Sequence, residues 1–169
     1  MSVVLRHLLS VLLLPFMVVI VVPRWLRGLS DSHTHWLRGT IGEWPLHVGA
    51  VALFLAGLAL FVWCVGLFAT SGKGTLAPWD PTKRLVAVGP YRHVRNPMIT
   101  GVGAMLGGQA LVYSSWMLVA WFAGFIVVNH LYFLISEEPG LERRFGADYA
   151  RYKAAVPRWI PRIKPWTET

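Results

Sequence analysis

The sequence predicts an all-α membrane protein: a polytopic helix bundle with about four transmembrane helices and a cytoplasmic amphipathic C-terminal helix. Three observations predict this class. Apolar residues make up 55% of the 169 residues and charged residues only 14%, against about a quarter in a typical soluble domain. The apolar residues fall into runs that can cross a bilayer. Nine Trp suit the membrane interfaces. We therefore expect a single membrane domain over residues 1–169.

Four apolar runs are the expected spans, at about residues 7–26, 47–69, 98–113 and 116–135. The first could be read as a signal peptide, but Pro23-Arg24-Trp25 stands where a cleavage site of small residues would be, so a retained helix is favoured. The second is free of charge and long enough to cross a hydrocarbon core of about 30 Å. The third is rich in Gly and Ala at spacings of four, which lets a neighbouring helix approach closely. A turn at Ser114-Ser115 leads into the fourth.

Basic residues assign the two sides of the membrane. The loop 70–97 carries five Lys or Arg and the tail after Ile135 carries seven, against three between the first two spans. The positive-inside rule then places this loop, the tail and both termini in the cytoplasm. The net charge of +8 is explained by the same bias and by anionic lipid headgroups, because the basic residues flank apolar runs. We therefore expect membrane lipids as partners and no nucleic acid.

The C-terminal cytoplasmic segment 136–169 has its own periodicity. Apolar residues recur there at helical spacing, with Arg and Lys on the other faces: Leu141, Phe145, Tyr149, Tyr152 and Val156. This predicts an amphipathic helix that lies on the membrane or covers the cytoplasmic ends of the spans. Pro139 lacks an N–H, so the fourth span should stop or kink near Ser136, and Pro157 should end the amphipathic helix.

Signatures of soluble nucleotide and metal enzymes are missing from the sequence. No GxGxxG follows a strand, and Gly72-Lys73-Gly74 lacks the rest of a phosphate loop. There is no HExxH, and the single Cys64 excludes a disulfide or a Cys-based metal cluster within the chain. We expect no metal site.

Two polar segments remain, and a hairpin of the third and fourth spans should bring them together: the loop 83–97 and the pair Glu137-Glu138. Adjacent carboxylates at a membrane boundary cost free energy unless cations or donors meet them. Arg92, Arg95 and the tail arginines are available, so the pair could be a salt-bridge clamp or part of a ligand site. The proline-containing loop and the ring of Tyr91 would suit a flat, positively charged ligand that carries an amine.

The two segments also resemble a known superfamily. Residues 89–101 resemble the motif G-x-Y-x-x-x-R-[HN]-P-x-Y-x-G of the isoprenylcysteine carboxyl methyltransferase and phospholipid methyltransferase superfamily. Residues 137–157 resemble its segment E-E-x-x-L-x-x-x-F-G-x-x-Y-x-x-Y-x-x-x-V-P. The motifs stand in the family's order. Trp79-Asp80-Pro81 is similar to bacterial members, which implies a bacterial inner membrane.

The resemblance implies an integral membrane methyltransferase that uses S-adenosylmethionine, with a lipophilic acceptor entering from the bilayer. Glu137 would meet the amine or ribose of the cofactor, and Arg95 and Glu138 would orient its pocket. Glu138 and His130 are candidate catalytic residues for an acceptor that must lose a proton; His130 is also explained as a buried, hydrogen-bonded residue. The cofactor-binding positions carried over are Leu85, Val86, Gly89, Tyr91, Arg95, Asn96, Pro97, Met98, Ile99, Gly101 and Glu137.

Two positions depart from the family pattern. Ile99 stands where the motif has Tyr, and Phe133 stands where an Arg often holds the carboxylate of the acceptor. The second departure disfavours a prenylated cysteine and favours a less acidic lipophilic acceptor, such as a lipid amine, hydroxyl or thiol. Two other functions stay open: a membrane reductase of related architecture that uses NADPH, and a non-catalytic membrane scaffold. The sequence leaves the oligomeric state open.

Overall fold

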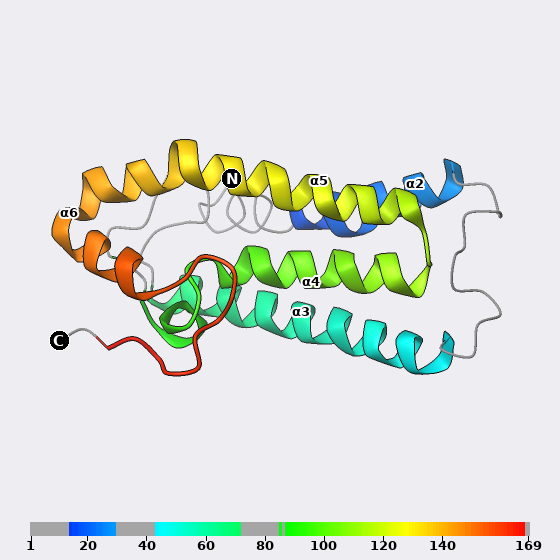
Figure 1. Ribbon diagram of the computed structural model, residues 1–169, viewed down its shortest axis with the longest axis horizontal. Coiled ribbons are helices and arrows are strands. Elements are labelled where there is room, and N and C mark those ends of the chain that lie inside the picture. The colour runs from blue at the N-terminus through cyan, green and yellow to red at the C-terminus, as the bar shows by residue number, and fades with distance from the viewer. Residues whose placement is uncertain (1–13, 30–42, 72–84, 86, 168–169) are drawn as a thin grey trace.

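The computed structural model describes residues 14–29, 43–71, 85 and 87–167. Their regular structure is helical, with no strand among them (Figure 1). The predicted all-α fold class is therefore confirmed. Residues 7–13 of the first predicted span lie outside the described part of the chain, as do residues 72–84 and Val86, which make up half of the loop 70–97.

The elements, in chain order, are η1 (Met17–Val21), α2 (Val22–Leu29), α3 (Glu43–Ser71), η3 (Gly89–Arg92), α4 (Pro97–Val112), α5 (Trp116–Tyr132), η4 (Phe133–Glu137) and α6 (Glu138–Ala155). The helix α4 lies between α3 and α5, and the N-terminal helix runs beside α5 (Figure 1). The turn between α4 and α5 lies at one end of the bundle. The other end holds η3, α6 and the C-terminal segment, so the loops with polar motifs gather there.

Two helices are long and apolar enough to cross a membrane: Trp44–Leu67 within α3, and the rod Trp116–Ala155 that begins with α5. Their most apolar windows are only 22% and 11% buried, as expected for helices that face lipid and not for the core of a soluble domain. This exposure favours a helical membrane protein. The apolar helix α4 matches the third predicted span in extent, but it is shorter than these two, and a count of four spans stays a prediction.

Small residues let the backbones of α3 and α4 touch. A Cβ added to Gly101 would lie 2.8 Å from the carbonyl oxygen of Gly57, and one added to Gly108 would lie 2.7 Å from that of Ala50. Both distances are shorter than any side-chain carbon tolerates. The predicted close helix approach is therefore found, and Gly103 on another side of α4 faces α5 instead.

The N-terminal helix is attached to α4 and α5 through two freed carbonyl groups. Pro23 has no N–H to offer the carbonyls four and five residues before it, which belong to Val19 and Val18. Gln109 Nε2 donates to the carbonyl of Val19 at 2.8 Å, and Trp121 Nε1 donates to that of Val18 at 3.1 Å. An unpaired carbonyl is costly in lipid, so these bonds fix where the N-terminal helix sits.

The predicted stop or kink near Ser136 is found in part, because α5 ends at Tyr132 and the π-helical turn η4 spans Ser136, but the chain stays helical. The π-helical turn η4 carries α5 into α6, and the wider turn accommodates Pro139 without breaking the rod. The break comes at Gly146, whose φ of 52° and ψ of −126° lie outside the helical region. The predicted end before Pro157 is confirmed, because α6 ends at Ala155 and Val156 is extended.

Candidate functional site

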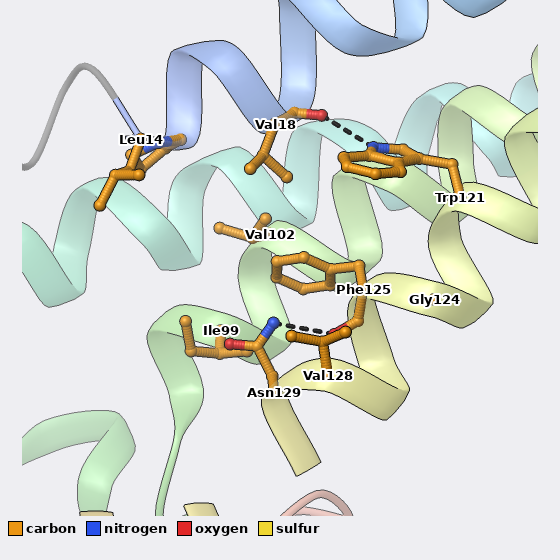
Figure 2. Close-up of a pocket in the computed structure, with 10 residues that line it drawn as sticks. Leu14, Val18, Ile99, Val102, Trp121, Gly124, Phe125, Val128 and Asn129 are labelled. Atoms are coloured by element: carbon orange, nitrogen blue, oxygen red, sulfur yellow. Dashed lines mark hydrogen bonds between the residues drawn. The ribbon is translucent and has the colours of Figure 1, made fainter. Parts of the chain in front are cut away.

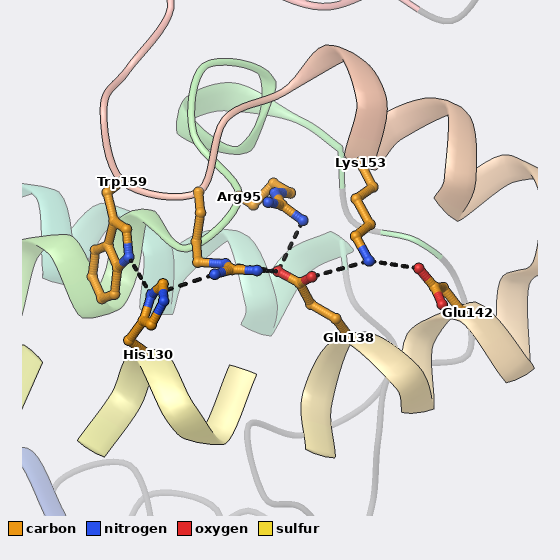
Figure 3. A network of polar contacts seen from close by, with 7 residues as sticks. Arg95, His130, Glu138, Glu142, Lys153 and Trp159 are labelled. Atoms are coloured by element: carbon orange, nitrogen blue, oxygen red, sulfur yellow. Dashed lines mark hydrogen bonds and ion pairs between the residues drawn. The ribbon is translucent and has the colours of Figure 1, made fainter. Parts of the chain in front are cut away.

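The carboxylate pair meets the loop before α4, as the predicted hairpin requires. Arg95 Nη1 lies 2.8 Å from Glu138 Oε1, although 43 positions separate the two residues (Figure 3). The short turn between α4 and α5 returns the chain, so the start of α4 and the end of α5 share one end of the bundle. The predicted proximity of the two segments is therefore confirmed.

Glu138 is the centre of an ion-pair cluster. Its Oε1 accepts hydrogen bonds from Arg95 at 2.8 Å and from Arg158 Nε at 2.8 Å, and its Oε2 lies 3.2 Å from Lys153 Nζ (Figure 3). The residue is only 4% exposed. Burial alone would raise the pKa of Glu138, but the hydrogen bonds and charges of Arg158, Arg95 and Lys153 together hold it below its ordinary value. An ionised carboxylate held in this way suits a clamp and makes a poor proton acceptor, so the geometry does not favour Glu138 as a base.

His130, the other candidate base, is also held in place. Its Nδ1 accepts a hydrogen bond from Trp159 Nε1 at 3.1 Å and lies 3.3 Å from Arg158 Nη1 (Figure 3). A neutral imidazole has one accepting nitrogen, and here that nitrogen is already used. The contacts match the structural reading of His130, as a hydrogen-bonded residue that holds the C-terminal segment.

The carboxyl of Glu137 differs from that of Glu138 in its hydrogen bonds and in its pKa. No side chain of the described residues donates a hydrogen bond to its carboxyl. Burial, and then the charge of Glu138, raise the pKa of Glu137 from 4.5 to about 7. The residue ends the π-helical turn η4, and such turns are frequent at functional sites. A partly buried carboxyl beside which the described residues place no cation is therefore the group that a cationic ligand would satisfy.

A second unsatisfied group lies close by in the same cluster. The Nε of Arg95 is buried and has no hydrogen-bond partner, although Nη1 of the same side chain pairs with Glu138. S-adenosylmethionine carries both an ammonium and a carboxylate. An unpaired carboxyl on Glu137 and an unpaired N–H on Arg95 are the complementary groups, so the residues present fit this cofactor.

The loop η3 is packed inward against α3. Gly89 has a φ of 53°, which a residue with a side chain rarely adopts. Tyr91 is 7% exposed, and its hydroxyl shares a hydrogen bond with the thiol of Cys64. Burial above all, and then the contact with Cys64, raise the pKa of Tyr91 well above 10. The buried ring supports the loop, so it is less open to a ligand than the sequence suggested.

The C-terminal segment runs alongside this loop and holds it by backbone hydrogen bonds. The amide of Arg162 donates to the carbonyl of His93 at 2.9 Å, and His93 Nδ1 donates back to the carbonyl of Arg162 at 2.7 Å. The amide of Trp166 donates to the carbonyl of Arg92, also at 2.9 Å, and the hydroxyl of Tyr152 donates to the carbonyl of Tyr91 at 2.6 Å. Sequence reasoning missed this contact, because residues 157–166 have no periodicity and their partners are mainly backbone atoms.

The other predicted positions fall into distinct surroundings. Leu85 packs on the buried cluster of Tyr149, Tyr152 and Val156, so the predicted apolar stripe covers the loop. Gly101 faces α3, which explains its small size by helix packing and does not favour a cofactor contact. The remaining ones form the start of α4: Asn96 before its first residue, Pro97 buried at its first position, Met98 against the apolar core and Ile99 at a cavity.

That cavity has a volume of about 360 Å³ and lies between the N-terminal helix, α4 and α5 (Figure 2). Leu14 and Val18 come from the first of these, Ile99 from the second and Phe125 from the third. Its lining is almost entirely apolar. The cavity therefore suits a lipophilic molecule next to the end of the bundle where the polar groups gather.

The described residues thus form a bundle of apolar helices, as in a membrane protein, with an unsatisfied charged group and an apolar cavity toward one end. The chain belongs to the phospholipid methyltransferase family, whose sequence model matches residues 45–148. Membership implies a membrane methyltransferase with a lipid substrate. The match covers α3 to α5 and the carboxylate pair, and ends within α6. No curated protein and no solved structure matches the chain.

Proposed function

We propose that the protein transfers a methyl group from S-adenosylmethionine to a lipophilic acceptor in the membrane, at the cytoplasmic face. The observation that carries this proposal is the contrast between the two adjacent carboxylates. Glu138 is saturated by cations, whereas Glu137 has a raised pKa and no donor among the described side chains. A partly buried carboxyl that no described side chain pairs with is available to a cationic ligand.

When bound, S-adenosylmethionine supplies a methyl group on a sulfonium, which is already a strong leaving group. Glu137 would accept hydrogen bonds from its ammonium or its ribose, and Arg95 would donate through Nε. The loop and the start of α4, with Leu85, Val86 and Asn96, would line the rest. The cation cluster around Glu138 keeps these groups in position.

The chain's own contribution is mainly positioning. Three cations hold Glu138 ionised and the accepting nitrogen of His130 is already used, so the proposal assigns proton removal to neither residue. Holding two reactants in line can supply roughly 7–11 kcal/mol of a barrier. An amine acceptor would then enter in its neutral form or lose its proton to water.

The acceptor is not an acidic one in this proposal. Phe133 is 2% exposed and packs on Trp159 with ring centroids 5.7 Å apart, so the position offers no charge to a carboxylate. This supports a lipid amine, hydroxyl or thiol over a prenylated cysteine. The positive-inside bias supports a cytoplasmic location of both termini in this single-domain protein. The similarity of Trp79-Asp80-Pro81 to bacterial members supports a bacterial inner membrane.

Calorimetry with S-adenosylhomocysteine on the purified, detergent-solubilised protein tests the cofactor. We expect micromolar binding that Glu137→Gln weakens 10- to 100-fold, because a hydrogen bond to a charged group contributes about 1.5–3 kcal/mol. Glu142→Gln is the matched control, since Glu142 is exposed and pairs with Lys153 on the surface. A folded protein that binds NADPH instead would be a reductase, and one that binds neither would be a scaffold.

A further inference from the structure

We propose that the apolar cavity binds the acceptor, and that Asn129 selects an acceptor with an uncharged hydrogen-bond donor, a hydroxyl or a neutral amine, on a single slim apolar chain or a small ring system. This inference rests on the proposed function and narrows its substrate class. It depends on the position, size and lining of the cavity and on the orientation of one amide.

The rim of the cavity faces the lipid. Leu14 and Val128 both line it and are both 65% exposed, so a molecule in the bilayer can reach it from the side. A Cβ added to Gly124 would have no atom within 4 Å, which shows that this part of α5 borders open space. An apolar space of this kind holds water poorly and favours an apolar occupant.

The cavity is preformed. One wall is the N-terminal helix, which the bond from Trp121 to the carbonyl of Val18 fixes to α5 (Figure 2). Its volume of about 360 Å³ is near the lower end of the roughly 300–1,000 Å³ of small-molecule sites. One chain or a small ring system fits there, whereas a two-chain phospholipid would leave most of its apolar part outside.

Asn129 gives the cavity its polar end. Its Nδ2 donates to the carbonyl of Phe125 at 2.8 Å, which leaves its Oδ1 facing Ile99 (Figure 2). That oxygen can accept a hydrogen bond from a hydroxyl or an amine but has nothing to give an ether. Among the described lining residues no side chain is charged, so an ionised head group would be buried without a partner.

The polar end also lies on the correct side. Asn129 precedes Glu137 by eight residues, about 12 Å at 1.5 Å per residue, and Ile99 follows the loop by one helical turn. A head group held at Asn129 would therefore be at the end of the cavity toward the unsatisfied groups of Glu137 and Arg95.

Photolabelling in phosphatidylcholine nanodiscs tests the inference. The probe is a long-chain alcohol with a diazirine in its alkyl chain. The comparison compound is the methyl ether of the same alcohol. We expect the alcohol to label peptides that contain Leu14, Val102 or Phe125 at least five times more than the ether does. In the Asn129→Leu variant the alcohol and the ether should label the site equally, because the apolar part of each probe still binds. Gly124→Leu should fill the cavity and abolish labelling by both probes.

The control is Gly49→Leu, the same substitution on α3, also with no atom within 4 Å but away from the cavity. It should label like the wild type. Binding of S-adenosylhomocysteine should persist in all three variants, so its absence from the wild type contradicts the proposed function alone. The inference is overturned if Gly124→Leu still labels, if alcohol and ether label equally in the wild type, or if added phosphatidylethanolamine displaces the alcohol.

Discussion

At the scale of single residues, two adjacent carboxylates have opposite surroundings. Glu138 points into a cluster of three cations, whereas Glu137, one residue earlier on the same rod, faces none that the structure describes. Accordingly, the pKa of Glu138 is lowered and the pKa of Glu137 is raised. The pair thus combines the two readings that the sequence left open, since one residue is a clamp and the other is available to a ligand.

Glu137 predicts a pH dependence of stability. Its pKa in the folded protein, about 7, lies above 4.5, so the folded state binds a proton that the unfolded state has released. The free energy of unfolding should therefore fall as the pH rises from about 4.5 to about 7. Thermal melts of Glu137→Gln should match the wild type at pH 5 and exceed it at pH 8, by up to about 3 kcal/mol at 1.36 kcal/mol per pKa unit. Equal melts at both pH values would contradict the raised pKa.

A conservative substitution of Glu138 should cause a large loss of stability. Glu138→Gln leaves Arg95 and Arg158, both mostly buried, without their counter-ion, which typically costs about 3–5 kcal/mol. Because its pKa is lowered, the contribution of Glu138 is present above 4.5 and lost as the pH falls through its folded pKa. Thermal unfolding at pH 7 measures the loss. Glu142→Gln should change the melting temperature little, since its pair with Lys153 is exposed.

At the scale of elements, proline and glycine decide how the helices meet. Glycines let α4 lie against α3 at backbone contact, and Pro23 frees carbonyls that pull α4 and α5 onto the N-terminal helix. Both devices work in lipid, where close packing and satisfied backbone groups replace the hydrophobic effect between helices. One of these contacts, from Trp121 to the carbonyl of Val18, fixes the N-terminal helix that forms one wall of the cavity for the proposed acceptor.

The contact of α3 and α4 can be tested with one methyl group. Gly108→Ala would place a Cβ 2.7 Å from the carbonyl oxygen of Ala50, so the helices must move apart, at a cost of about 1–3 kcal/mol. Gly49→Ala adds the same methyl group where no atom lies within 4 Å, and it should be neutral or stabilising. Melting temperatures in detergent compare the two, and equal values would exclude this contact.

The bond from Gln109 predicts a coupling with Pro23. Gln109→Leu leaves the carbonyl of Val19 unpaired and should cost about 1–2 kcal/mol of unfolding free energy. Pro23→Ala supplies an N–H within the helix, so the same Gln109→Leu change should cost much less in that background. A double-mutant cycle measures the difference. Additive effects would mean that the carbonyl does not depend on Gln109.

At the scale of the whole molecule, one end of the bundle is closed by a segment from the far end of the chain. Residues 157–166 pair with residues 92–95, and α6 packs on Leu85 and Ala87 just before them. The proposed cofactor site thus depends on residues from the start of η3 to the C-terminal segment. Loop, helix ends and tail are expected to respond as one unit.

Removal of the chain from Arg162 onward should loosen this unit. The truncated protein loses the bonds to His93 and Arg92, so the amides of His93 and Val94 should exchange at least tenfold faster in hydrogen–deuterium exchange. S-adenosylhomocysteine should also bind more weakly. The substitution Lys164→Ala, at an exposed position within the same segment, is the control and should leave both measurements unchanged. Unchanged exchange after truncation would show that the tail does not support the loop.

The sequence by itself determined the all-α class, the helices at 98–113 and 116–135 and the meeting of the loop with the carboxylate pair. Apolar runs and a short turn are local properties of the sequence. Two helices joined by a short turn bring the residues before the first helix close to those after the second, whatever their side chains are. Only the tertiary structure decided which carboxylate is paired, because Arg158 and Lys153 arrive from residues that no spacing ties to Glu138. It also placed a further break at Gly146, beyond the π-helical turn that spans Ser136 and accommodates Pro139.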